Sequence, residues 1–186
     1  MARVRIVRAA PLAVALILAQ PSSPAADQPL TRSYDVSGST YSELLASMRR
    51  NGPLVGRTGR RHPGITEVGF RPRWTVRPEA TRCVLVSGEV AIDLVMTVPR
   101  WPGRADAPPP LRRRWDALRD DIVAHERVHA RIARDFLGRM RRALNRPTSA
   151  SDCDALNALH TKRAQTIVDR HRVAQRSFDA RTFGGS

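Results

Sequence analysis

Several features are scarce in this sequence of 186 residues, and each shortage argues against a class of protein. Aromatic residues make up only 5%, so few side chains can stack on bases as in a nucleic-acid-binding protein. The two cysteines are not in C-x-x-C spacing, which argues against a cysteine-ligated zinc site. Beyond the N-terminal segment no apolar run is long enough to cross a membrane. The length suits one domain, and the sequence has no internal repeat.

Acidic residues are also in short supply. Lysine and arginine number 32 against 17 aspartates and glutamates, which gives a formal net charge of +15. Because Lys162 is the single lysine, 31 of these 32 basic residues are arginine. The arginines are spread along the chain and do not form one stripe, which argues further against nucleic acid as a partner. An anionic partner of another kind remains an alternative.

The N-terminus has the pattern of a signal peptide. Three arginines precede an apolar segment, residues 9–19, that is too short to span a bilayer as a helix. Small residues follow, and we predict cleavage near Ala25 or Ala26. The predicted organisation is a signal peptide at 1–26 and a single domain at 27–186, secreted or periplasmic and without stable membrane insertion. An uncleaved membrane anchor is the alternative.

Export would place Cys83 and Cys153 in an oxidising compartment, where an even pair of cysteines is usually bridged. We therefore predict a disulfide that ties the start of a strand to the start of the last helix. Two buried free thiols are the alternative. Neither cysteine is expected to bind zinc.

Alternating apolar residues predict strands in the first half of the domain. Residues 33–37, 66–76 and 83–98 alternate in this way, with every second side chain apolar. Pro72 lies within the second segment and cannot donate to a ladder, which indicates an edge strand or a bent one. Gly88 interrupts the third, which is one long strand or a bent pair. The strands predict an antiparallel sheet with helices on one face.

Apolar residues at steps of three and four predict helices elsewhere. Thr40 and Glu43 have the spacing of a capping box at the start of a short helix. A long helix is predicted over 111–145 and another over 151–178, and their short link makes them antiparallel neighbours. The predicted fold class is therefore α+β, with a small antiparallel sheet packed against two long antiparallel helices.

The first long helix contains an H-E-x-x-H motif, residues 125–129. Residues four apart lie on the same face of a helix, so His125 and His129 can present ring nitrogens to one metal ion. Glu126 is then placed to deprotonate a metal-bound water, as in zinc metallopeptidases. The apolar stripe of the helix continues through the motif. This favours a metal site over two ordinary core histidines or a salt-bridge ladder.

A catalytic zinc ion needs a third protein ligand. When the two long helices are paired, His125 comes level with residues 170–172, and this arithmetic favours His171. An ordinary core histidine is the alternative for that position. Asp169 and His160 are further candidates on the same helix.

A series of short motifs also runs through the predicted mature chain: Tyr34-Asp35-Val36-Ser37-Gly38, Met48, Gly52-Pro53, Cys83, Pro99-Arg100-Trp101, Trp115, His125-Glu126-x-x-His129, Cys153 and Phe178-Asp179-Ala180-Arg181-Thr182. In this order the motifs resemble those of a bacterial family of predicted secreted zinc-dependent proteases, catalogued as a domain of unknown function. The resemblance implies export, a Cys83–Cys153 disulfide, a zincin-like α+β fold and peptidase activity.

The resemblance also bears on the third ligand. It implies Asp179, and an aspartate oxygen is an acceptable zinc ligand. The closing motif of the family usually reads Tyr-Asp-x-x-Thr-x-His-Gly, whereas here Phe178 stands for the tyrosine and Gly184 for the histidine. We predict Asp179 as the third ligand, with His171 as the alternative.

The leading functional hypothesis is a secreted or periplasmic zinc-dependent metallopeptidase that acts on peptides or proteins. In it His125, His129 and Asp179 bind zinc, Glu126 is the general base, and an edge strand holds the substrate. The second hypothesis is a catalytically inactive zinc-containing envelope protein that binds an anionic partner through its arginines. The altered closing motif favours this second hypothesis.

Overall fold

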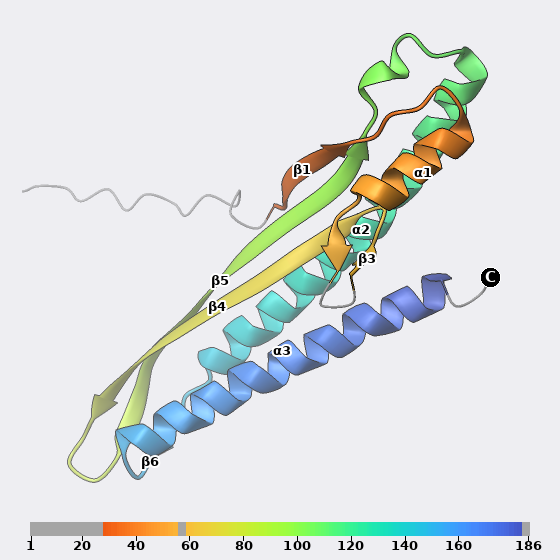
Figure 1. Cartoon of the computed structure of the whole chain (residues 1–186). Helices are drawn as coiled ribbons and strands as arrows, with labels where there is room; N and C mark the ends of the chain where they lie inside the picture. Colours follow the sequence, from red (N-terminus) through yellow and green to blue (C-terminus); the bar gives the residue numbers. More distant parts are fainter. Residues whose placement is uncertain (1–27, 56–58, 184–186) are drawn as a thin grey trace, which may run out of the picture.

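The fold is built on a long two-stranded ribbon against which two long helices pack (Figure 1). The computed structural model describes residues 28–55 and 59–183, so the predicted signal peptide lies outside the described residues. In chain order the elements are β1 Leu30–Asp35, α1 Tyr41–Asn51, β2 Leu54–Val55, β3 Arg60–Arg61, β4 Ile65–Pro78, β5 Cys83–Arg100, a 3₁₀ turn Pro102–Arg104, α2 Pro109–Leu144, β6 Ser149–Ala150 and α3 Cys153–Phe183.

The main sheet is organised around β5. Strand β4 pairs with it antiparallel over nearly its whole length, and the short β6 pairs antiparallel with its first residues. Strand β1 pairs with the last residues of β5 but runs parallel to it, which differs from the predicted antiparallel sheet. The chain between β1 and β5 includes α1 and β4, and a long connection of this kind permits parallel pairing. Strand β4 is an edge of this sheet, as Pro72 predicts.

A bulge in the ribbon changes which side chains of β5 face the helices. The register slips between Thr75 and Val76 of β4, and Val86 has no Cα partner there. The buried face consists of even-numbered residues from 88 to 98, but beyond the bulge it includes Cys83. The prediction that Val86 shares the buried face is therefore wrong, because one extra residue reverses the alternation. Val86 is exposed, and Cys83 is turned toward the helices.

Two hydrophobic clusters form the core on the helix side of the ribbon. The first joins the N-terminal half of α2 to α1 and the end of β5, and the second joins the C-terminal half of α2 to the middle of β5. On α2 the first cluster ends at Val123 and the second begins at Ala133. The turns between these two positions contain the H-E-x-x-H motif, which consequently lies at the junction of the two clusters.

Helices α2 and α3 are the two long antiparallel helices that the sequence predicts (Figure 1). Helix α3 continues through Phe183, five residues beyond the predicted end at 178 (183 − 178). Asp179, which follows the predicted helix, is therefore a helical residue. Among the described residues, no helix has the length and hydrophobicity that crossing a membrane requires.

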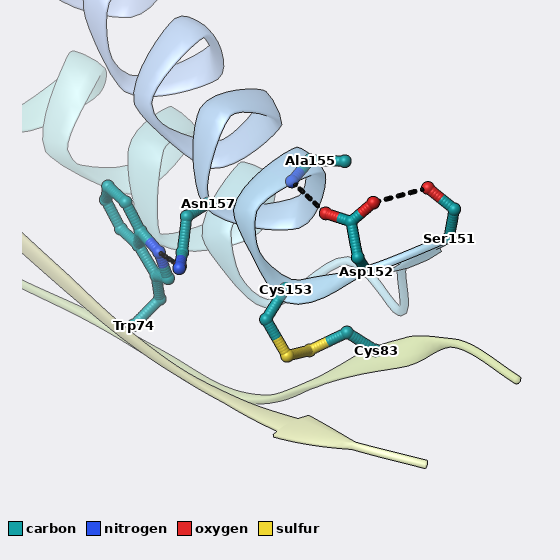
Figure 2. Close-up of a disulfide and its surroundings, with 7 residues drawn as sticks. All are labelled: Trp74, Cys83, Ser151, Asp152, Cys153, Ala155 and Asn157. Carbon is teal, nitrogen blue, oxygen red and sulfur yellow. Dashed lines mark hydrogen bonds between the residues drawn. A yellow bond between two sulfur atoms is a disulfide. The ribbon is translucent and has the colours of Figure 1, made fainter. Parts of the chain in front are cut away.

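The predicted disulfide is confirmed, and it anchors the start of α3 to β5 (Figure 2). Cys83 and Cys153 form the bridge, so neither cysteine is a free thiol. One turn further along, the Trp74 indole N–H donates to Asn157 Oδ1 at 2.9 Å. The same end of the helix is capped by Asp152, whose Oδ1 accepts from the Ala155 N–H at 2.8 Å.

A close approach at Gly88 fixes the C-terminal end of α2 against β5. A Cβ atom at this position would clash with the main-chain oxygen of Leu144, so only glycine lets the helix come this near to β5. The Asn145 side chain accepts from the Gly88 N–H and donates to the Gly88 carbonyl. Gly88 thus lies within one continuous strand and secures the end of α2 against it.

Candidate metal centre

Three potential ligand atoms from two helices meet at the junction of the hydrophobic clusters. His125 Nε2 and His129 Nε2 are 3.0 Å apart. Asp179 Oδ1 lies 2.9 Å from His129 Nε2 and 3.4 Å from His125 Nε2. The structure thus brings together the residues of the H-E-x-x-H pair with the aspartate, as one group that could hold a metal ion.

These separations fit coordination of a single ion. Two donors that are each about 2.0–2.1 Å from one tetrahedral ion lie about 3.3 Å from each other. The three observed separations, 2.9–3.4 Å, are close to this value. Without a cation or a proton between them, a carboxylate and two imidazole lone pairs would repel one another. The residues present therefore fit a divalent metal.

Helical spacing on both sides produces the convergence. His125 and His129 are one turn apart on α2, so their rings lie on the same face. On α3, three polar residues occur at steps of four (His171, Gln175 and Asp179) and form one stripe that faces α2.

Burial favours the neutral form of the His125 imidazole. The side chains of His125 and His129 are 14% and 12% exposed, while that of Asp179 is 47% exposed. Burial lowers the pKa of His125, and the neighbouring His129 lowers it further. The Phe178 ring packs on both imidazoles, with ring centroids 4.8 and 5.0 Å away. Neutral rings are the form that binds metal ions.

Glu126 lies beside the cluster in a site of its own. Glu126 is only 4% exposed. The hydroxyl of Thr66 on β4 donates to Glu126 Oε2 at 2.8 Å. Burial raises the pKa of Glu126, and the hydrogen bond from Thr66 opposes this rise. A Cβ atom at Gly64 would lie 2.9 Å from Glu126 Oε1, so the glycine makes room for this second carboxylate oxygen. The segment that contains Gly64 is held by Tyr34, whose hydroxyl donates to the carbonyl of the preceding residue, Pro63, at 2.9 Å.

This geometry can be compared with known proteins. A family model described as "Bacterial protein of unknown function (DUF922)" matches residues 31–185. The chain belongs to this bacterial family. The description of the family names no activity, so membership alone does not identify a protease. Neither the curated proteins nor the solved structures contain a match.

The other candidate ligands of this family member lie outside the cluster. His171 is buried beside the Phe70 and Phe136 rings, and its Nε2 contacts Gln175. Asp169 is exposed and bonds to neighbouring side chains of α3. His160 is buried against Trp74, near the disulfide end of the helix. Asp179 is therefore the third member of the cluster, whereas His171, which helix spacing favours, lies outside it.

Sequence reasoning missed several residues around the site. Gln175 bonds to His129, and a sequence signal for it existed, because it lies one turn from each of His171 and Asp179. Thr66 had no such signal, since it is 60 residues away from Glu126 along the chain. Phe178 was noted for the tyrosine it replaces, but its packing on both histidines was not predicted.

Proposed function

We propose that this protein is a zinc-dependent peptidase with a zincin-like arrangement of its site. The observation that carries the proposal is the convergence of His125, His129 and Asp179, with Glu126 buried beside them. His125, His129 and Asp179 would hold the zinc ion, since catalytic zinc sites use three protein ligands. Bound zinc would supply Lewis-acid chemistry that lowers the pKa of a water molecule to about 7.

Within this proposal Glu126 is the general base. Its carboxylate takes a proton from the attacking water and passes it to the leaving amine. Thr66 fixes one carboxylate oxygen, Oε2, and the space at Gly64 leaves room around the other.

The free edge of β4 is the proposed binding surface for the peptide. In the part of the chain that the structure describes, β4 pairs along one edge only, with β5. Its second residue, Thr66, bonds to Glu126, so the strand leads directly away from the site. A peptide added along this edge would be held extended by main-chain hydrogen bonds.

The disulfide supports export, since such bridges persist in oxidising compartments.

Removal of the metal tests this function, because cleavage should depend on bound zinc. The purified chain, loaded with zinc, should cleave members of a broad peptide library, detected by mass spectrometry. A strong chelator should abolish cleavage, and zinc should restore it. Iron(II) and manganese should be tried in parallel, because two histidines and a carboxylate also bind iron(II) in oxygenases. A zinc-loaded chain that cleaves no library peptide contradicts the proposed activity.

A surface hollow favours the second candidate, an envelope protein that binds an anionic partner. Arg127, Arg131 and Arg134 line a hollow of about 350 Å³ between α2 and the start of β1. Arginine side chains bind carboxylates and phosphates through paired hydrogen bonds. Salt-sensitive retention on an anionic resin, by a chain that carries zinc but is inert on the library, would favour this function.

A further inference from the structure

The side-chain amide of Gln175 uses all of its hydrogen-bonding groups between two histidines. Gln175 Oε1 lies 2.6 Å from His129 Nδ1. Its nitrogen lies 3.2 Å from the main-chain oxygen of His129, to which it donates, and 2.8 Å from His171 Nε2. An amide has two N–H donors and one acceptor oxygen, so each group of Gln175 has a partner.

These contacts determine which way the amide points. A main-chain oxygen can only accept, so the nitrogen end of Gln175 faces the His129 carbonyl. The oxygen end then faces His129 Nδ1, and that ring nitrogen must carry the proton. In the neutral ring the lone pair of His129 is then on Nε2, the atom that lies 2.9 Å from Asp179 Oδ1.

His171 completes the contacts of the Gln175 amide. Its ring is buried against the Phe70 and Phe136 rings, and burial lowers its pKa to about 4. At neutral pH the ring is therefore uncharged, and its Nε2 accepts from the Gln175 amide. The orientation set by the His129 carbonyl thus places an amide N–H opposite the lone pair of His171 Nε2.

We propose that Gln175 is a positioning residue that holds His129 in the tautomer whose Nε2 is free to bind a divalent metal ion. The competing tautomer has its proton on Nε2 and would donate it to Asp179, 2.9 Å away. That closed arrangement would have to be broken before a metal could bind. Gln175 disfavours this tautomer because its Oε1 needs a proton on His129 Nδ1. This inference rests on the proposed metal centre and adds a residue that binds no metal itself.

The direct test is nitrogen NMR of the metal-free chain with labelled histidine, at a pH above the titration of the imidazoles. In the native chain His129 should be the Nδ1–H tautomer. Gln175→Met keeps the length of the side chain but removes its donors and acceptor, and should shift His129 toward the Nε2–H tautomer. Gln165→Met, whose exposed side chain bonds to Asp169 on the same helix, is the matched control and should leave His129 unchanged.

Zinc affinity, measured by competition with a chromophoric chelator, is the second readout. It should fall roughly 10–100-fold in Gln175→Met, as expected for a residue that orients a ligand, and should not change in Gln165→Met. Gln175→Glu keeps an acceptor for Nδ1–H and should retain the Nδ1–H tautomer of His129. If the methionine variant does not fold, the native chain still decides the matter, because an Nε2–H tautomer of His129 there would overturn the inference.

Three results would overturn the inference: an Nε2–H tautomer of His129 in the native chain, an unchanged tautomer in folded Gln175→Met, or loss of the Nδ1–H tautomer in Gln175→Glu. A native chain that binds no zinc would instead overturn the proposed function. In that case the tautomer of His129, read without metal, would still decide the role of Gln175.

Discussion

Replacing Glu126 by glutamine should lower peptide hydrolysis by about 10²–10⁴-fold while zinc remains bound. Glutamine has nearly the same shape and can still accept from Thr66, so the ligands on the same helix should keep their positions. It cannot take a proton from water, which is the role proposed for the carboxylate. The measurement is the rate of cleavage of a library peptide, together with zinc content.

Stability provides the control for this variant. Burial raises the pKa of Glu126, which means that the ionised carboxylate is disfavoured in the folded chain. The neutral amide removes that cost, so the melting temperature should not fall. Glu89→Gln, an exposed change of the same kind on β5, should keep full activity. Hydrolysis by Glu126→Gln at the native rate would contradict the proposed mechanism.

Loss of the disulfide should have the largest effect on stability. The Cys83–Cys153 bridge spans 70 residues, and closing a loop of that size stabilises a fold by about 4 kcal/mol. Replacing both cysteines by serine should lower the free energy of unfolding by about that amount, measured by chemical denaturation. Reduction of the native chain should reproduce the loss, and reduction of the double variant should add nothing.

The effect of this change should be confined to stability. Asp179 is 26 positions beyond Cys153 on α3 (179 − 153), about 39 Å along the helix. Under conditions in which the double variant is folded, its zinc affinity should therefore match that of the native chain. A double variant as stable as the native chain would show that the bridge contributes little to this fold.

Sequence patterns predicted the parts of the fold that depend on local periodicity. The helical stripe through the H-E-x-x-H motif and the alternation of β4 and β5 each depend on neighbouring residues. The parallel pairing of β1 and the bulge at Val86 do not, because both depend on contacts with distant strands. One extra residue in β5 was enough to make Cys83 a buried residue, and no local pattern marks it.

The site divides in the same way. His125, Glu126 and His129 could be chosen from spacing alone, but the partner from α3 could not. His171 and Asp179 were treated as alternatives, whereas the structure has both on one stripe with Gln175 between them. Pairing the two long helices predicted the correct face of α3, but it favoured His171, which lies about two turns before Asp179. That the three clustered residues bind zinc stays a prediction.

Zinc titration of the metal-free chain tests the central claim most directly, with ligand variants compared under the same competing chelator. The native chain should bind one zinc ion, and Asp179→Ala should weaken binding by more than the roughly 10–100-fold expected for residues outside the ligand set. Asp169→Ala, an exposed aspartate on the same helix, is the control and should bind zinc as the native chain does. Equal affinities for the native chain and Asp179→Ala, or no binding by the native chain, would contradict the metal centre.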